Sequence, residues 1–227
     1  MRVLVIDTSS RPVAAMLVAG DAPDASPLVQ HLGLVEGAHD RRHAEELAPA
    51  VAALAAEHGR PDLVVVGTGP GPFTGLRVGL VTARTLARGW GAALAGVPSL
   101  DAVARVALDA HPGATVVVAT DARRREVYHG RYRAAGPDEV EVLAGPAVAA
   151  GAQVGADLAP GVVVVGEKAD EVTGGDRQAD VPTPDPAAFP RALARLALVR
   201  RAAGASLPTE PLYLRRPDAA VPAQVAP

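Results

Sequence analysis

Residues 2–9 read Arg2-Val3-Leu4-Val5-Ile6-Asp7-Thr8-Ser9, an apolar, β-branched run that stops at a cluster of small polar side chains. Such a run predicts a buried strand over Arg2–Ile6 that ends in a polar turn. A second strand, Pro12–Val18, follows at hairpin distance, and Leu28–Val35 supplies a third strand. The chain therefore begins with three sequential strands.

Helices and strands alternate after this point. Leu47, Val51 and Leu54 recur on one face of a predicted helix over His43–His58, in which Pro49 lies early. The next predicted elements are a strand Leu63–Gly67, a helix Thr74–Trp90, a strand Ala92–Val97 and a helix Ser99–Ala110 with Ser99 as its N-cap. Three strands followed by helix–strand–helix–strand is the order of a ribonuclease-H-like mixed sheet.

The second half of the chain starts over with strand, hairpin and strand. Its predicted elements are strands Thr115–Thr120, Glu126–Arg133, Val140–Leu143 and Val162–Val165, a long loop Gly166–Pro186, a helix Pro190–Ala203 and an extended segment Pro211–Arg215. Two such halves make the actin-like ATPase (ASKHA) architecture, an α/β fold of two similar lobes with mixed sheets and flanking helices. We expect a ribonuclease-H-like lobe over residues 1–110, a smaller lobe over 111–205 and a tail over 206–227. Nucleotide normally binds between the lobes of this architecture, but function must be argued from sites.

Composition excludes several classes of protein. The 227 residues carry a net charge of −3, are 49% hydrophobic and contain no cysteine, which excludes disordered chains, disulfide scaffolds and thiol catalysis. No apolar run is long enough to span a bilayer, and the first run is too short for a signal peptide, so we expect a cytoplasmic protein. Aromatic residues are 3% and Lys168 is the only lysine, a bias that makes arginine counts uninformative about nucleic acid.

The turn Asp7-Thr8-Ser9 is the first candidate site. Its amides and hydroxyls could hold a phosphate, and Asp7 could hold magnesium waters. The alternative is a plain hairpin turn built by side-chain hydrogen bonds. Phosphate turns in active proteins of this architecture usually contain a glycine, and this one has none, so any phosphate site here is vestigial.

A second candidate is the glycine-proline loop Gly67-Thr68-Gly69-Pro70-Gly71-Pro72-Phe73-Thr74-Gly75-Leu76-Arg77. Free amides between a strand and a helix can hold an anion. The loop matches neither a P-loop nor a dinucleotide fingerprint, and its two prolines remove two amide donors. We expect a rigid loop that fixes where the next helix begins.

That next helix carries a stripe of small residues. Gly75, Gly79, Ala83 and Ala87 recur every four residues, and such a row lets a second helix approach closely. The stripe could instead pack on the chain's own sheet. Because Leu76, Leu80 and Leu86 offer a separate apolar face, the sequence favours a stripe that is free for a partner.

Other candidate sites are weaker. His39 and His43 have metal-ligand spacing, but no third ligand accompanies them, so no metal site is predicted. The run Asp121-Ala122-Arg123-Arg124-Arg125 places three arginines in a turn, which could meet phosphates or carboxylates or be a solvated surface. No nucleophile–base pair indicates a hydrolase, and no catalytic residue is predicted.

The same motifs carry a resemblance to the TsaB (YeaZ) family of bacterial tRNA threonylcarbamoyladenosine synthesis. They occur in order across nearly the whole chain: Val5–Ser9, His43-Ala44-Glu45 with Leu47 and Pro49, Gly69–Gly79, Val97–Leu100, Asp121–Arg124 and Pro211–Arg215. Ala44 and Pro72 depart from the family, which usually has serine at both positions.

The resemblance implies a non-catalytic partner of TsaD, the enzyme that transfers threonylcarbamoyl to the adenosine next to the anticodon (t6A) in tRNAs reading codons that begin with A. It implies a heterodimer with TsaD, association with the ATPase TsaE, tRNA contact through the complex, no membrane, and a possible homodimer when the chain is alone. No cofactor is expected in this chain, since ATP and a metal belong to TsaD and TsaE. The alternative is a degenerate actin-like ATPase or sugar-kinase-like enzyme that uses Asp7 and the cleft between the lobes.

The partner surface is predicted on two helices, about His43–His58 and Thr74–Arg88. The first helix offers a row of small side chains, Ala44, Ala48, Ala52 and Ala55, beside the row of Leu47, Val51 and Leu54. The second helix offers the small-residue stripe. Two helices from each molecule would form a four-helix bundle. The interface residues predicted are His43, Glu46, Leu47, Val51, Gly75, Arg77, Gly79 and Ala83.

Overall fold

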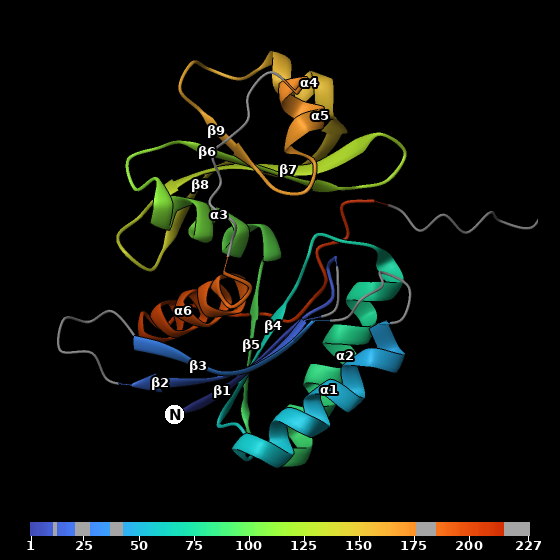
Figure 1. The fold of residues 1–227 in the computed structure, drawn as a ribbon, viewed down its shortest axis with the longest axis vertical. Helices are drawn as coiled ribbons and strands as arrows, with labels where there is room; N and C mark the ends of the chain where they lie inside the picture. The colour runs from blue at the N-terminus through green and yellow to red at the C-terminus, as the bar shows by residue number, and fades with distance from the viewer. Residues whose placement is uncertain (11–12, 21–27, 37–42, 176–184, 216–227) are drawn as a thin grey trace, which may run out of the picture.

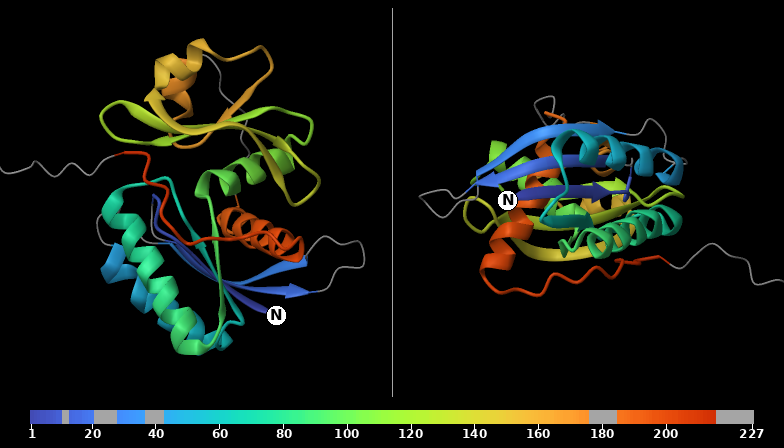
Figure 2. Two further views of the ribbon diagram at one scale, coloured as in Figure 1. Left: turned by 180° about the vertical axis from the view of Figure 1, so that it is seen from behind. Right: turned by 90° about the horizontal axis from the view of Figure 1, so that it is seen from below.

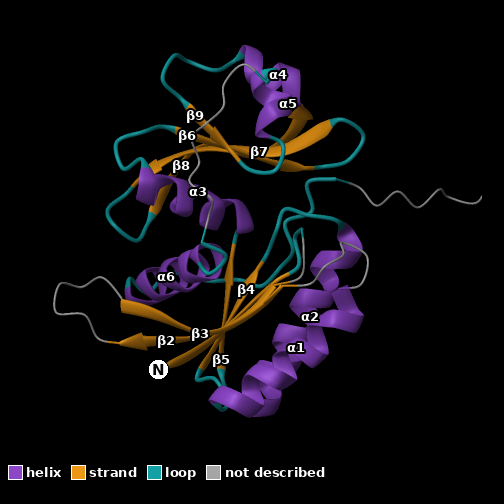
Figure 3. Cartoon of the chain, in the orientation of Figure 1, coloured by secondary structure: helices purple, strands orange, loops and turns teal. Residues whose placement is uncertain are grey.

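Two mixed sheets, one in each lobe, organise the molecule (Figures 1 and 3). The computed structural model describes residues 1–10, 13–20, 28–36, 43–175 and 185–215. Within these ranges the chain builds one lobe, crosses to the second and then returns to the first.

The first sheet has the strand order β3-β2-β1-β4-β5. Its strands are β1 (Arg2–Asp7), β2 (Val13–Gly20), β3 (Leu28–Glu36), β4 (Leu63–Gly67) and β5 (Ala93–Val97). β1 pairs antiparallel with β2 and parallel with β4, as the ribonuclease-H-like order requires. Leu4 and Ile6 face one apolar cluster and Val3 and Val5 face the other, because successive side chains point to opposite faces of a strand.

The second sheet repeats this pattern in the order β8-β7-β6-β9. Its strands are β6 (Val116–Asp121), β7 (Glu126–Ala134), β8 (Val140–Ala150) and β9 (Val163–Val165), and the short helices α4 (Gly151–Ala156) and α5 (Ala169–Thr173) pack on it. Both lobes of the predicted actin-like fold are therefore present. Neither α4 nor α5 was predicted from the sequence, because elements of five or six residues show no periodicity. The predicted strand at Val140 ends too early, at Leu143, because residues 144–150 are mostly alanine and glycine.

Helices cover both faces of the first sheet. α1 (His43–His58) and α2 (Phe73–Trp90) lie side by side on its outer face, and α3 (Ser99–Ala110) and α6 (Ala188–Ala202) lie between the two sheets (Figure 1). α6 contacts every strand of the first sheet. The predicted lobe over residues 111–205 is wrong in this respect, because the chain returns to the first lobe to bury the apolar face of α6.

The predicted tail begins with a segment that packs along both lobes. Residues 205–215, here named the C-terminal strap, run from α6 across the first lobe to the second (Figures 1 and 2). The carbonyl of Leu207 accepts from the Gly96 amide at 3.0 Å, and the Leu212 amide donates to the Thr68 carbonyl at 2.9 Å. At the far end, Arg215 donates to the Ala122 carbonyl at 2.5 Å. The strap thereby joins the edge of the first sheet to the second lobe.

Candidate functional site

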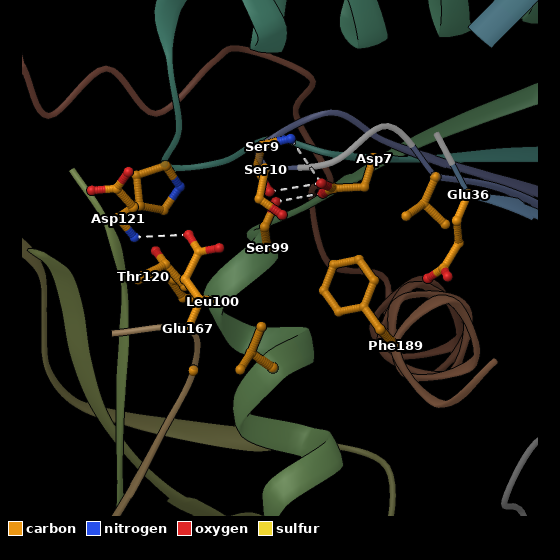
Figure 4. A pocket seen from close by; sticks show the side chains of 14 residues that line it. Asp7, Ser9, Ser10, Glu36, Ser99, Leu100, Thr120, Asp121, Glu167 and Phe189 are labelled. Carbon is orange, nitrogen blue, oxygen red and sulfur yellow. Dashed lines mark hydrogen bonds between the residues drawn. The ribbon is translucent and has the colours of Figure 1, made fainter. Parts of the chain in front are cut away.

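The Asp7 carboxylate links the carboxyl end of β1 to the following turn and to the start of α3 through hydrogen bonds. One carboxylate oxygen, Oδ1, accepts from the Ser9 amide at 2.8 Å and from Ser9 Oγ at 2.6 Å, while Oδ2 accepts from Ser99 Oγ at 2.6 Å (Figure 4). Asp7 is only 1% exposed. Both oxygens of the carboxylate are therefore engaged inside the chain, in the manner of a structural turn.

Thr8 and two glycines allow α2 and β4 to pack tightly against the end of β1. Thr8 Oγ1 donates to the Gly75 carbonyl at 2.7 Å, which fixes the first turn of α2 against β1. A Cβ added at Gly79 would lie 2.3 Å from Thr8 Oγ1, and one added at Gly67 would lie 1.6 Å from Asp7 Oδ2. These glycines are required because the side chains of Thr8 and Asp7 fill the space that a Cβ would need.

The first amides of the glycine-proline loop donate hydrogen bonds to groups within the protein. The Gly69 amide donates to Ser99 Oγ at 3.1 Å, the Ser99 amide donates to the Gly69 carbonyl at 2.7 Å, and the Thr68 amide donates to the Val97 carbonyl at 2.9 Å. These bonds anchor the loop to β5 and to the start of α3. The predicted N-cap at Ser99 is wrong: Pro98 occupies that position, and the Ser99 hydroxyl bonds to Asp7 instead of to its own helix.

A cavity of about 240 Å³ lies between the lobes beside this turn (Figure 4). Its lining includes four carboxylates and no lysine, arginine or histidine among the residues that the structure describes. The acidic residues are Asp7, Glu36, Asp121 and Glu167. Glu167 Oε1 accepts from the Asp121 amide at 2.9 Å.

Among the described residues, the lining offers a bound phosphate no cationic side chain. A phosphate held here would meet carboxylates of its own sign and would find the amides of Thr68, Gly69 and Ser9 already bonded. Across the described ranges, no three acidic, histidine or cysteine side chains are grouped to hold a metal ion. His39 lies outside those ranges.

The small-residue stripe of α2 faces the interior. Gly75, Gly79, Ala83 and Ala87 are all buried, and Ala83 is 0% exposed in the cluster that also contains Leu76 and Leu80. The interpretation that the stripe is free for a partner is therefore wrong. The physical reason is that α2 packs against the sheet on one side and against α1 on the other. The buried part of its surface therefore includes both the small-residue stripe and the row of leucines.

The predicted interface residues of α1 divide in the same way. Leu47 and Val51 are buried in the core of the first lobe, and Glu46 is half-buried. Leu47 and Val51 cannot form a surface in the folded chain, although the same periodicity correctly places them on one face of the helix. The side chain of His43 lies outside the described part of the chain.

Arg77 is the predicted interface residue that the structure leaves exposed. Its Nε donates to the hydroxyl of Tyr213 at 3.0 Å, and its guanidinium carbon lies 3.8 Å from the centre of the Phe73 ring. The Phe73 and Tyr213 rings are 4.8 Å apart. The C-terminal strap therefore holds Arg77 in place at the start of α2.

The solvent-facing sides of α1 and α2 form one surface, which we name the outer helix face. It consists of Ala48, Ala52, Ala53 and Ala56 on α1 and of Val81, Arg84, Thr85 and Arg88 on α2. Val81 is 59% exposed. Ala48 and Ala52 belong to the alanine row that the sequence predicts on the first helix, and both are exposed; Ala55 of that row is half-buried, and the side chain of Ala44 lies outside the described part of the chain. The α2 residues of this surface were not predicted. The signal for them is their position, because they remain after both apolar rows of α2 are assigned to the core.

The turn between β6 and β7 presents the arginine run. Arg123, Arg124 and Arg125 are exposed, and the Arg123 amide donates to Asp121 Oδ1 at 2.9 Å. This segment is a turn, as the sequence predicts, and it lies at the end of the strand that contributes Thr120 and Asp121 to the cavity between the lobes.

Comparison with known proteins gives one matching family model and several similar relatives. Residues 29–191 match the family described as "TsaD: tRNA N6-adenosine threonylcarbamoyltransferase". An uncharacterized protein of Mycobacterium tuberculosis is 39% identical over 96% of this chain and 93% of its own length. The tRNA threonylcarbamoyladenosine biosynthesis protein TsaB of Haemophilus influenzae is 32% identical over 56% of this chain and 52% of its own length, so about half of each chain is aligned. A Mycobacterium leprae relative is longer, and the alignment spans 55% of it at 38% identity.

A solved structure extends the likeness to the whole fold. YeaZ from Pseudomonas aeruginosa superposes with a TM-score of 0.68 and 25% identity, covering 94% of this chain and 99% of that one. The actin-like, ribonuclease-H-like architecture is thus confirmed by both topology and comparison. Among the described helices, none has the length and apolar character needed to cross a membrane.

Proposed function

Because this chain belongs to the TsaB (YeaZ) family, whose named members serve tRNA threonylcarbamoyladenosine biosynthesis, we propose that it is the non-catalytic partner of a TsaD-type transferase. In this proposal TsaD transfers threonylcarbamoyl to the adenosine next to the anticodon, and TsaE joins the pair. ATP and any metal belong to those partners, and this chain brings no cofactor. All of these proteins act in the cytoplasm.

The state of Asp7 is the observation that carries the non-catalytic assignment. In an actin-like enzyme, the corresponding carboxylate would be available to metal waters beside the nucleotide. Here Oδ1 and Oδ2 accept three hydrogen bonds from Ser9 and Ser99, and the adjoining cavity is lined by further carboxylates. No observation favours the alternative of a degenerate ATPase or sugar kinase.

The outer helix face supports the partnership. Its alanines give a low surface that another helix pair can approach closely, and Val81 adds an exposed apolar side chain. The family model for TsaD covers this chain from residue 29 to 191, so a TsaD-type partner would present a similar pair of helices. We therefore place the four-helix contact on the outer helix face, and a second copy of this chain could occupy it when TsaD is absent.

Reconstitution tests the activity. TsaD, TsaE, threonylcarbamoyl-adenylate and unmodified tRNA are incubated with and without this chain, and t6A is measured. We expect modification only when TsaD and this chain are both present. Modification by this chain alone, or magnesium-dependent ATP turnover by it, would refute the assignment.

A pair of matched variants tests the surface. Val81→Asp puts a carboxylate on the outer helix face, whereas Val142→Asp puts one on β8 of the second lobe, where the valine is 45% exposed. Titration calorimetry with TsaD should show at least tenfold weaker binding for Val81→Asp, equivalent to about 1.4 kcal/mol, and unchanged binding for Val142→Asp. Equal affinities for the two variants would remove the outer helix face from the interface.

A further inference from the structure

The turn between β6 and β7 has an unusual backbone. Arg123, Arg124 and Arg125 all have positive φ angles, of 66°, 53° and 62°. Side chains other than glycine and asparagine strongly disfavour this left-handed region, and three such residues in succession are rarer still. A turn selected for stability alone would contain glycine at these positions.

The surrounding structure holds the turn in this conformation. The Ala122 amide donates to the Glu126 carbonyl at 3.0 Å, and the Glu126 amide donates to the Arg123 carbonyl at 3.0 Å. From the C-terminal strap, Arg215 donates to the Ala122 carbonyl and pairs with Glu126 at 3.0 Å. The three side chains are thus presented to solvent from a fixed base, which lowers the entropy lost when a ligand binds them.

The turn is a local positive surface on a chain of net charge −3. Asp121 pairs with Arg123 at 3.1 Å, Glu126 pairs with Arg215, and Glu167 accepts from the Asp121 amide. Together with Arg124 and Arg125, these seven charged side chains have a net charge of +1. Strained backbone is typical of functional sites, because it persists only where something other than stability requires it.

We propose that the Arg123–Arg125 turn binds the sugar-phosphate backbone of the tRNA substrate, an inference that rests on the proposed function. Guanidinium groups match the geometry of phosphate oxygens and bind them bidentately. The turn contains no aromatic side chain that could stack on a base, so the contact would position the RNA without reading its sequence. An acidic protein fits less well, because protein interfaces have an apolar centre and Ala122, the apolar residue next to the turn, is buried.

The test uses a double variant whose expected effects on stability and on tRNA binding are opposed. Arg124→Gly/Arg125→Gly relieves the backbone strain at two residues with positive φ and removes two positive charges. We expect its Tm to rise by about 2–4 °C or more. The affinity of the complete complex for unmodified tRNA should fall roughly tenfold, and the dependence of log K on log salt should lose about two units of slope.

Arg60→Ala/Arg201→Ala is the charge-matched control, since both arginines are exposed and lie outside the turn. It should leave tRNA affinity and salt dependence near those of the unchanged protein. If the turn variant binds tRNA as the control does, the proposal is overturned. Binding of TsaD without RNA is measured in parallel for both chains. No TsaD binding by the unchanged chain would refute the proposed function, whereas loss of TsaD affinity in the turn variant alone would assign the turn to a protein interface and overturn the tRNA proposal.

A third arm separates RNA from small phosphates. Inorganic triphosphate is titrated into this chain without tRNA or the other proteins, and the Kd is measured by calorimetry. We expect binding no tighter than about 1 mM, because exposed guanidinium groups on one turn do not enclose a small anion. A tighter, saturable site that the turn variant loses would indicate a small phosphate ligand and would refute RNA backbone binding as the role of the turn.

Discussion

Substitution of Gly79 by alanine tests most directly whether the small-residue stripe of α2 packs inside the first lobe. The added Cβ would lie 2.3 Å from Thr8 Oγ1 and 3.2 Å from Thr8 Cγ2, well inside ordinary contact distance. Thr8 is buried and its hydroxyl is committed to the Gly75 carbonyl, so it cannot turn away without losing that bond. Overpacking of this kind costs about 1–3 kcal/mol, and a lost buried hydrogen bond adds about 1 kcal/mol.

Alanine also has an advantage over glycine in a helix, worth about 1 kcal/mol. The net expectation is a loss of about 1–3 kcal/mol in the free energy of unfolding, measured by urea denaturation at constant m-value. Gly89→Ala is the control in the same helix, because a Cβ there has no neighbour within 4 Å. It should stabilise the chain by about 0.5–1 kcal/mol.

The double variant Thr8→Ala/Gly79→Ala sharpens the result. Because Thr8→Ala removes the clashing hydroxyl and methyl, the two substitutions together should be less destabilising than the sum of their separate effects. If Gly79→Ala instead stabilises as Gly89→Ala does and weakens TsaD binding, then the stripe faces outward and the packing argument is refuted.

Two further outcomes are expected. Asp7→Ala leaves the Ser9 and Ser99 hydroxyls without their buried acceptor, so unfolding in urea should show a loss of about 3 kcal/mol, while t6A formed per folded molecule is retained; a fully stable variant with no t6A would contradict this. Burial raises the pKa of Asp101 above its ordinary value of 3.8, although Arg200 lies 2.9 Å away and opposes the shift. A raised carboxyl pKa stabilises the fold at low pH and loses that contribution as pH rises through the folded value. The free energy of unfolding of Asp101→Asn, taken relative to that of the unchanged chain and measured by urea denaturation, should therefore be higher at pH 7 than at pH 4. A difference that does not change with pH would show that the pKa of Asp101 is not raised.

Local patterns determined most of the element order. The apolar run of β1 and the recurrence of Leu47, Val51 and Leu54 are short-range signals, because a strand or helix shows its buried face in a few consecutive residues. The polar turn at Asp7 was also visible, since it interrupts an apolar run. Its hydrogen bonds to Ser99 were not visible, because the two residues are 92 positions apart.

Only the tertiary structure decided which surfaces of these elements are exposed. The sequence shows that α2 has a row of small residues and a row of leucines, but not that the sheet and α1 together bury both. It shows that α6 is apolar on one side, but not that the chain crosses back to the first lobe to bury that side. Burial depends on how many neighbours a helix has and where they lie, and those neighbours come from distant parts of the chain.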